Sequence, residues 1–464
     1  MTTTPEIASP DRLFSGRHLP LVLGVIGLVT LSALENRAVG TALPTMVREF
    51  DALGSFGLAN AAPSASFVIS LAVAGLWSDR HGPIRTLQLG AIAFTLAQLL
   101  VGTAVSMPMV IAGRVLSGFA EGLVDVSLLV LVARALPAVL RPRMMSLFAA
   151  MWVLPSVFGP LLTGVVTEQF GWRWVFIGAL VLLVPTWLLL RPAMRQSQRM
   201  PSPERTPEDL AELQAWRAAL PWAMAISVAL FALTFVGDHL RKHPVSGGAA
   251  VAVSLALLVV GAGRVLPRGV FVAARGFPAL VVVRGLTGAA FGGVGAFLPL
   301  LLTLQHHLTP SRAGVTLSIT GVFWAVGSWL QGREHRMERA QVLRAGLALM
   351  TLGLAVTSAL AWTNATAWFG LTGWAIAGIG MGLSSSSLSV LTLDLSDAGN
   401  SGRNSSAAQI AATMSVAAML AITGTLLAVN ADNPRPWVFG VIISAGVVLA
   451  ALALLCAGRV RPRH

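Results

Sequence analysis

The chain has 464 residues, of which 55% are hydrophobic and only 11% are charged. Because a soluble domain carries roughly 25% charged residues, a water-soluble fold of this chain would expose far too much apolar surface. The formal net charge is +13, but the basic residues lie in short loops and mostly on one side of the apolar blocks, so they predict membrane orientation and no nucleic-acid partner.

Unbroken apolar blocks run through the whole chain. Each has roughly the length that a helix needs to cross about 30 Å of hydrocarbon. Bounded by Arg, Pro and Gly, the blocks predict fourteen membrane spans, at residues 19–47, 56–77, 86–106, 108–132, 143–166, 174–190, 219–236, 246–263, 279–304, 311–331, 342–361, 365–390, 404–428 and 436–457.

The basic residues are distributed unequally between the two sides of these spans. With the N-terminus in the cytoplasm, 23 of the 32 lie on the cytoplasmic side and six in outer loops. An excess of Arg and Lys marks the cytoplasmic side, so we expect both termini to be cytoplasmic. The basic inner rim also favours contact with anionic membrane lipids.

The longest polar stretch divides the chain. Residues 191–218 contain three prolines and mixed charges and are predicted to form a cytoplasmic linker. The sequence therefore predicts a six-helix bundle at 1–190, the linker at 191–218, two additional helices at 219–263 and a second six-helix bundle at 264–464.

The loop after the second span reads GLWSDRHGPIR at residues 75–85. Gly75 and Gly82 permit a tight turn between helices. Asp79 lies beside Arg80 and near Arg85 at the membrane face. By itself this pattern is also compatible with an ordinary basic inner loop.

The fourth and fifth spans carry further motifs. RVLSGFAEG at 114–122 places Arg114 inside an apolar block. WVLPSVFGPLLTG at 152–164 combines small residues at helix-contact spacing, such as Gly159, with prolines that bend a helix, such as Pro160.

In this order, the three motifs resemble the signature set of the major facilitator superfamily. LENRAVGTALP at 34–44, GWRWVF at 171–176 and LPLLLTLQ at 298–305 are similar to motifs of its fourteen-helix drug:proton antiporter branch. The resemblance implies an all-α polytopic membrane protein with two six-helix bundles and two extra central helices, alternating access, and multidrug export driven by proton entry. The bias of 31 Arg to one Lys is typical of a GC-rich bacterial genome, such as an actinobacterial one, so we expect the protein in a bacterial cytoplasmic membrane.

The chain departs from the branch pattern at three positions. Glu35 stands where an aspartate is usual, Arg37 where a small hydroxyl residue is common, and Ser117 where a glutamine is common. These departures leave the choice of substrate open.

Six charged residues lie well inside the predicted spans. Each costs roughly 2.5 to 3.5 kcal/mol to insert unless it is paired or hydrated, so they should face the bundle interior or a water-filled space. They are the candidates for function: Glu35, Arg37, Arg114, Glu121, Asp125 and Arg284.

Counting about 1.5 Å per residue from the outer boundary places Glu35 roughly 18 Å deep and Glu121 roughly 20 Å deep, both near the midplane. Arg114, Gly118, Glu121 and Asp125 follow the spacing of one helix face, which predicts a polar stripe toward one neighbour.

We expect Glu35, Glu121 and Asp125 to be the proton-titrating carboxylates, with Arg114 as their partner. The alternative is a static network in which Arg37 and Arg114 pair with these acids. Arg284 lies near the cytoplasmic end of its span and is predicted to reach toward the membrane surface.

The predicted substrate cavity contains Asn36, Arg37, Trp152, Gln305, Phe323 and Trp324. Instead of lining the cavity, the aromatic residues could serve in packing, and Gln305 could form a hydrogen bond at the membrane interface. The predicted conformational gate contains Gly75, Asp79, Arg80, Gly82, Arg85, Gly159 and Pro160, although Asp79 could act only within its own turn.

A membrane-embedded enzyme is disfavoured, since the sequence has no His-Glu-x-x-His motif and no Cys/His cluster. We expect no metal and no cofactor, protons and a small organic molecule as ligands, and a monomer. A lipid, lipopeptide or metabolite exporter and a nutrient importer of the same fold stay open.

Overall fold

The computed structural model describes residues 13–461 apart from 17, 138–139, 141–143, 145–146, 148–150, 152, 200–206, 332–337, 364–365, 396–400 and 433–434. No strand occurs in this part of the chain. Its long helices are α1 (Leu19–Glu49), α2 (Phe56–His81), α3 (Pro83–Gly102), α4 (Met107–Ala135), α6 (Val153–Gln169), α7 (Arg173–Arg199), α8 (Pro207–Lys242), α9 (Pro244–Val265), α10 (Phe277–Leu304), α11 (Pro310–Gln331), α12 (Arg339–Trp362), α13 (Ala367–Asp394), α14 (Ser401–Val429) and α15 (Pro436–Ala457).

Helix formation follows from the apolar blocks, because a backbone inside hydrocarbon must satisfy its own hydrogen bonds. Five helices begin at a proline, which fits the first helical position because the missing N–H has no partner there anyway. Eleven of the helices are long and apolar enough to cross a membrane by length and composition. The predicted all-α polytopic fold is confirmed.

Two helices extend into the predicted linker at 191–218. α7 continues to Arg199 and α8 already begins at Pro207. The sequence there is polar but rich in Ala, Leu, Glu, Gln and Arg, which all favour helix. Polarity therefore marks the end of the membrane span and not the end of the helix.

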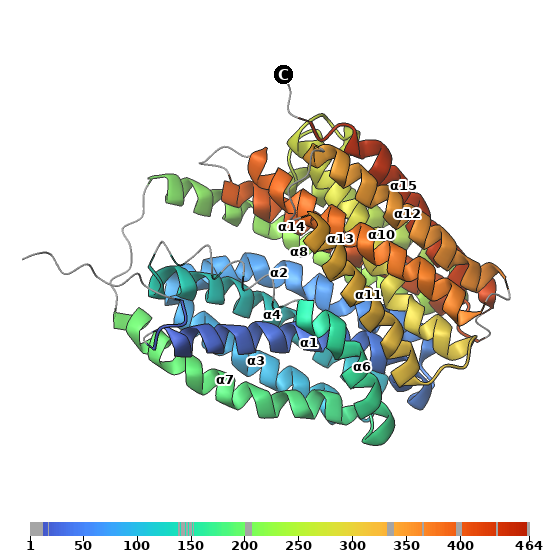
Figure 1. The fold of residues 1–464 in the computed structure, drawn as a ribbon, viewed down its shortest axis with the longest axis horizontal. Helices are drawn as coiled ribbons and strands as arrows, with labels where there is room; N and C mark the ends of the chain where they lie inside the picture. The colour runs from blue at the N-terminus through green and yellow to red at the C-terminus, as the bar shows by residue number, and fades with distance from the viewer. Residues whose placement is uncertain are drawn as a thin grey trace, which may run out of the picture.

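The first and last six long helices pack in the same pattern (Figure 1). α1 contacts α6 and α7, as α10 contacts α14 and α15. The contacts of α2 with α4 and of α3 with α4 and α7 recur as those of α11 with α13 and of α12 with α13 and α15. We call α1–α7 the N-terminal half and α10–α15 the C-terminal half.

α8 and α9 pack against each other beside the seam between the halves. α8 contacts both α2 and α14, which belong to different halves. The hydroxyl of Thr425 in α14 donates a 2.7 Å hydrogen bond to the carbonyl oxygen of Leu233 in α8. The extra pair thus adds to the bundle without replacing any contact of the repeated pattern.

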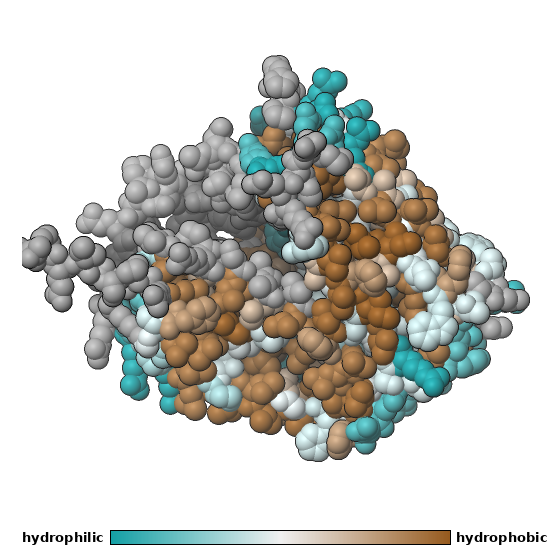
Figure 2. Space-filling view, in the orientation of Figure 1, coloured by the Kyte–Doolittle hydropathy of each residue, from teal (hydrophilic) through white to brown (hydrophobic). Residues whose placement is uncertain are grey.

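Large apolar side chains cover much of the surface (Figure 2). Leu455 is 75% exposed and Trp368 72% exposed. Apolar surface on this scale is unstable in water but suits contact with lipid.

Glycines allow α4 to approach α2 closely. A Cβ atom at Gly118 would lie 2.1 Å from the carbonyl oxygen of Pro63. One turn later, a Cβ atom at Gly122 would lie 2.7 Å from Cβ of Ser70, whose hydroxyl donates to the carbonyl oxygen of Phe119. Small residues four apart bring helix backbones together in membranes, and this contact sets the position of α4.

Replacing Gly118 by alanine should therefore destabilise the protein. The new methyl group meets backbone atoms that cannot rotate away, and overpacking of this kind costs about 1 to 3 kcal/mol. Thermal unfolding in detergent checks this. Gly178→Ala in α7 is the matched control, because a Cβ atom there meets nothing within 4 Å. Equal melting temperatures for the two variants would contradict the tight α2–α4 contact.

Candidate functional site

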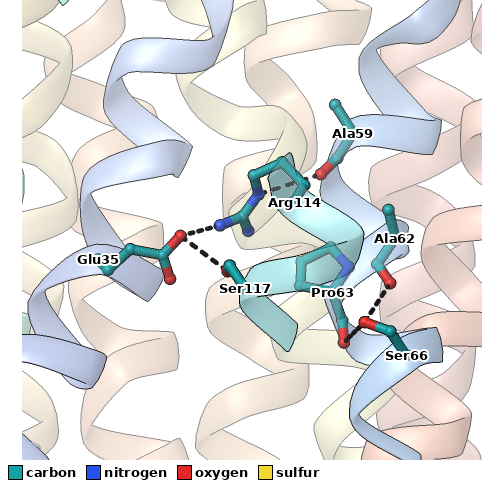
Figure 3. Close-up of polar contacts among 7 residues, drawn as sticks. All are labelled: Glu35, Ala59, Ala62, Pro63, Ser66, Arg114 and Ser117. Carbon is teal, nitrogen blue, oxygen red and sulfur yellow. Dashed lines mark hydrogen bonds and ion pairs between the residues drawn. The ribbon is translucent and has the colours of Figure 1, made fainter. Parts of the chain in front are cut away.

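A buried ion pair joins α1 to α4 (Figure 3). Nη1 of Arg114 donates to Oε1 of Glu35, and the hydroxyl of Ser117 donates a 3.1 Å hydrogen bond to the same oxygen. Glu35 is 6% exposed and Arg114 is 3% exposed. Pairing and hydrogen bonding are what make two charges tolerable in such a place.

A proline in α2 supplies a further contact for Arg114. Its Nε donates a 3.4 Å hydrogen bond to the carbonyl oxygen of Ala59 (Figure 3). In a regular helix that oxygen would accept from residue 63, but Pro63 has no N–H. The hydrogen bond missing from α2 therefore leaves an acceptor that fixes the Arg114 guanidinium.

α4 carries two acids, Glu121 and Asp125, beyond the Glu35–Arg114 pair. Glu121 lies one turn beyond Ser117, and Asp125 one turn beyond Glu121. Glu121 is 8% exposed and Asp125 is half-buried. Neither carboxylate has an ion pair or hydrogen bond within the described part of the chain. The polar side of α4 thus faces one paired acid, Glu35 of α1, and carries two acids without an ion pair, Glu121 and Asp125.

The stripe on α4 does not face a single neighbour, so that prediction is wrong. Gly118 packs on Pro63 of α2, whereas Ser117 faces Glu35 of α1. Consecutive residues point about 100° apart on a helix, and α4 meets both helices. The polar face is formed by Arg114, Ser117, Glu121 and Asp125.

Arg37 lies apart from the acids. Its guanidinium carbon is 5.8 Å from the ring centroid of Trp324 in α11, and its Nε is buried without a hydrogen-bond partner. The predicted network in which Arg37 pairs with an acid is therefore not formed in the described part of the chain. Arg37 instead contacts the C-terminal half through an aromatic ring.

Trp324 is the first of three aromatic side chains in the C-terminal half. The ring of Phe291 meets Trp324 edge-on at 5.4 Å and stacks on Trp374 at 4.7 Å. Trp374 is 2% exposed. This row of rings fixes the orientation of the Trp324 indole under Arg37.

Asn36 lies on the face of α1 that points toward the C-terminal half. Gly40 and Leu43 follow it at helical spacing. A Cβ atom at Gly40 would lie 3.8 Å from Leu317 of α11, and Leu43 is buried in the hydrophobic cluster that includes α10. Asn36 itself is exposed, so contact between the halves ends before it is reached.

The two halves touch at the end that the charge asymmetry assigns to the outside. A Cβ atom at Gly57 of α2 would lie 2.1 Å from Cα of Gly424 in α14. On the other side of the molecule, a Cβ atom at Gly314 of α11 would lie 2.3 Å from the carbonyl oxygen of Pro160 in α6. The buried core reflects this: one cluster joins the outer end of the N-terminal half to the C-terminal half, and another lies within the N-terminal half toward the opposite end.

Two of the predicted gate residues therefore lie at or beside a contact between halves. The hydroxyl of Ser318 in α11 accepts a 3.2 Å hydrogen bond from the backbone N–H of Leu161, next to Pro160. A Cβ atom at Gly159 would lie 3.6 Å from Cβ of Arg37, an ordinary contact distance, so Gly159 lies beside Arg37 where α6 packs on α1.

A carboxylate closes the outer end of the α6–α11 contact. Oε1 of Glu168 accepts a 2.7 Å hydrogen bond from the backbone N–H of Ser311, at the N-terminus of α11. Glu168 lies beyond the predicted span 143–166. Burial alone would raise the pKa of Glu168, but hydrogen bonds from Ser311 and Thr309 and the charge of Arg312 outweigh it and hold the pKa below its usual value.

The remaining predicted residues are distributed elsewhere. Gly75, Asp79 and Arg80 lie in α2, but their side chains are outside the described set, and Trp152 is outside the described residues. Four other predicted residues are described by the structure but do not contact the Glu35–Arg114 cluster. Gly82 has φ +83° in the turn between α2 and α3, Arg85 is exposed, Phe323 is half-buried beside Trp324, and Gln305 caps the outer end of α10 with a buried Nε2 that has no partner.

Arg284 makes contacts that its position in the sequence did not predict. Its guanidinium donates hydrogen bonds of 3.4 Å to Ser389 of α13 and 3.3 Å to Gln409 of α14. Arg284 therefore joins three helices of the C-terminal half in addition to any approach to the membrane surface.

A sequence model of the Major Facilitator Superfamily matches residues 25–422 of the chain. The chain belongs to the major facilitator superfamily. A probable multidrug-efflux transporter of Mycobacterium tuberculosis is 25% identical over 97% of both chains. The multidrug efflux pump SdrM of Staphylococcus aureus is 23% identical over 73% of both. Multidrug resistance protein 3 of Bacillus subtilis is 30% identical, over 35% of this chain and 33% of its own length.

Solved structures share the major facilitator fold at low identity. A bacterial homologue of the human lysosomal transporter Spinster, in an inward-facing and unoccupied conformation, has a TM-score of 0.66 at 14% identity, covering 96% of this chain and 98% of its own. An auto-inhibited peptide transporter of the POT family has a TM-score of 0.69 at 12% identity, with the same coverage. Together with the family match over most of the chain, this makes the protein a membrane transporter.

The Arg114–Glu35 pair gives a prediction for stability. Arg114→Met should lower the melting temperature strongly, because removing one partner of a buried pair costs about 3 to 5 kcal/mol. The double variant Glu35→Gln with Arg114→Met should recover much of the loss, since no unpaired charge is left. If the double variant is no more stable than Arg114→Met, the uncompensated Glu35 charge is not the cause.

Glu168 gives a prediction for pH dependence. Its lowered pKa means that the closed outer contact is favoured above the usual carboxylate value of about 4.3 and is lost as the pH falls through the lowered pKa. Spin labels at Gln169→Cys in α6 and Trp368→Cys in α13, in a Cys456→Ala background, should report longer distances in acid. Glu168→Gln should show the longer distances already at neutral pH and little further change on acidification. A pH response that Glu168→Gln leaves unaltered would exclude this role of Glu168.

Proposed function

We propose that this transporter exports small organic compounds in exchange for protons. The observation that carries the proposal is the arrangement of Glu35, Arg114, Ser117 and Glu121 between α1 and α4, at the predicted midplane. The name of its full-length mycobacterial relative, a probable multidrug-efflux transporter, supports the direction and the drug-like class of substrate.

Protons couple to transport through the Glu35–Arg114 pair. A carboxylate that binds an arginine in one conformation and loses it in another has a different proton affinity in each. Protonation of Glu35 removes one of the two charges and frees the Arg114 guanidinium. Glu121 and Asp125, which lack a partner among the described residues, continue the path of acids along α4 and take part in the same proton transfer.

The side to which the protein is open follows from the orientation of the chain in the membrane. We place both termini in the cytoplasm of a bacterial cell, as the basic residues predict. The Gly57–Gly424 and Pro160–Gly314 contacts then close the outer side, and the protein is in a state open to the cytoplasm. Transport requires these contacts to separate while the opposite ends of the halves approach each other, with Gly159, Pro160 and the loop around Asp79 as parts of the gate. The protein acts as a monomer.

The acids favour a cationic or zwitterionic substrate. Glu121 and Asp125 form no ion pair in the described part of the chain, so the amine of a substrate competes with protons for them. Competition of this kind is what an antiporter needs, because loading the substrate then releases the proton.

Transport by reconstituted protein tests the proposal. With an acidic interior, proteoliposomes should accumulate norfloxacin, a fluorescent zwitterionic antibiotic. Glu121→Gln should reduce this accumulation by about tenfold or more, in line with the loss of a proton-transfer group. Asp394→Asn is the matched control, because Asp394 forms an exposed ion pair with Arg339 at a helix end. Uptake that ignores the pH gradient would contradict the antiport.

A further inference from the structure

Among the described residues, one arginine inside the membrane has neither an ion pair nor a hydrogen bond. Arg114 is neutralised by Glu35, and Arg284 is hydrogen-bonded to Ser389 and Gln409. Arg37, twelve residues from the outer end of α1, has no hydrogen bond or ion pair in the described part of the chain. An arginine at this depth costs roughly 2.5 to 3.5 kcal/mol to insert, so its charge without a partner is a cost to the empty protein.

Among the helices on the Trp324 side of α1, and on α6, no acid is free to pair with Arg37. The unpaired acids Glu121 and Asp125 lie on α4, on the side of α1 that carries Glu35. α10 and α11 contain no Asp or Glu at all. The one acid of α6 is Glu168, at its outer end and engaged with Ser311. On α1, Glu35 lies nearly opposite Arg37 and is paired with Arg114. No acid of the described residues pairs with Arg37 in this conformation, so an anion bound from outside the chain can supply its counter-charge.

The contact with Trp324 leaves the Arg37 guanidinium able to bind an anion. A guanidinium that stacks on an aromatic ring uses its flat face, whereas its N–H donors point outward in its own plane. Nε of Arg37 is enclosed by the protein, but the two Nη groups have no partner within the described residues. Two parallel Nη donors match the two oxygens of a carboxylate.

The surroundings suit an organic acid with a ring. Trp324 and Phe323 are half-buried and provide apolar surface. Asn36, the residue before Arg37, is exposed and can donate or accept a hydrogen bond. Arg37 belongs to one half and Trp324 to the other, at the point where the contact between the halves ends.

We propose that Arg37 is the anion-binding residue of the substrate site, that it binds the carboxylate of a ring-containing organic compound, and that Trp324 positions its guanidinium. This rests on the proposed transport function and narrows it: among drug-like compounds, those with a carboxylate bind best, and a zwitterion satisfies Arg37 with its acid and Glu121 with its amine when the two groups are far enough apart.

Three dansyl probes that share one alkyl spacer and differ in the terminal group test the proposal. They are 6-(dansylamino)hexanoic acid, its amide, and dansylcadaverine, which ends in an amine. Binding to the intact protein in phosphatidylcholine nanodiscs is measured by dansyl fluorescence at pH 7, without a gradient. The acid should bind about tenfold more tightly than the amide, as expected for a charge-assisted pair of hydrogen bonds.

Variants of Arg37 and Trp324 show which residues cause the preference for the acid over the amide. Arg37→Gln should bind acid and amide equally, Arg37→Lys should keep part of the preference, and Trp324→Phe should keep more of it than Trp324→Ala. Arg284→Gln is the matched control, an intramembrane arginine whose partners lie in the C-terminal half, and it should keep the full preference.

Three results would overturn the proposal: an acid that binds no better than the amide, no measurable acid binding, or a preference that survives in Arg37→Gln. A preference that disappears in nanodiscs containing phosphatidylglycerol would assign Arg37 to an anionic lipid and would also overturn it. Because binding is measured without a proton gradient, the preference can fail while antiport holds, and antiport can fail while the preference holds.

Discussion

A charge inside a bilayer needs a partner, and the ion pair between Arg114 and Glu35 shows how this protein provides one. Three helices take part, since α1 supplies the acid, α4 supplies the guanidinium and the Ser117 hydroxyl, and α2 supplies the carbonyl oxygen that Pro63 leaves free. The close approach of α4 to α2 at Gly118 brings these groups within reach. Backbone packing and charge pairing thus depend on each other at this site.

The rest of the architecture places this cluster beside a seam. Both halves have the same pattern of helix contacts, and they join where glycine allows backbones to touch, as at Gly57 and Gly424. Contacts made by glycine and backbone involve no interlocking side chains, so their separation leaves no cavity of side-chain size behind. This property suits an interface that has to open and close, with Glu168 adding one hydrogen bond to a helix N-terminus that solvent can replace.

The sequence predicted the fold well and the site partly. Apolar block length gave the helices because a membrane leaves the backbone few alternatives, and depth counting brought Glu35 and Glu121 to the same level. Partners were harder to predict. Which acid pairs with Arg114, and why none of the described acids pairs with Arg37, depends on the angle at which α1 meets α4 and α11, which hydropathy does not encode. Ser117 was noticed only as a departure from a motif, and Pro63 only becomes informative once the helix that faces Ala59 is known. Glu168 was missed because it lies outside a span, although an acid at a helix end is a common partner for another helix N-terminus.

The central claim is that transport requires the outer contact between the halves to open, and a reversible cross-link tests it most directly. A Cβ atom at Gly54 would lie 3.6 Å from Cβ of Ala431, within the usual range for a disulfide of about 3.5 to 4.5 Å. In a Cys456→Ala background, Gly54→Cys with Ala431→Cys should form this bond on oxidation, abolish norfloxacin transport in proteoliposomes, and regain transport on reduction. Transport at the uncross-linked rate by fully cross-linked protein would contradict alternating access through this contact.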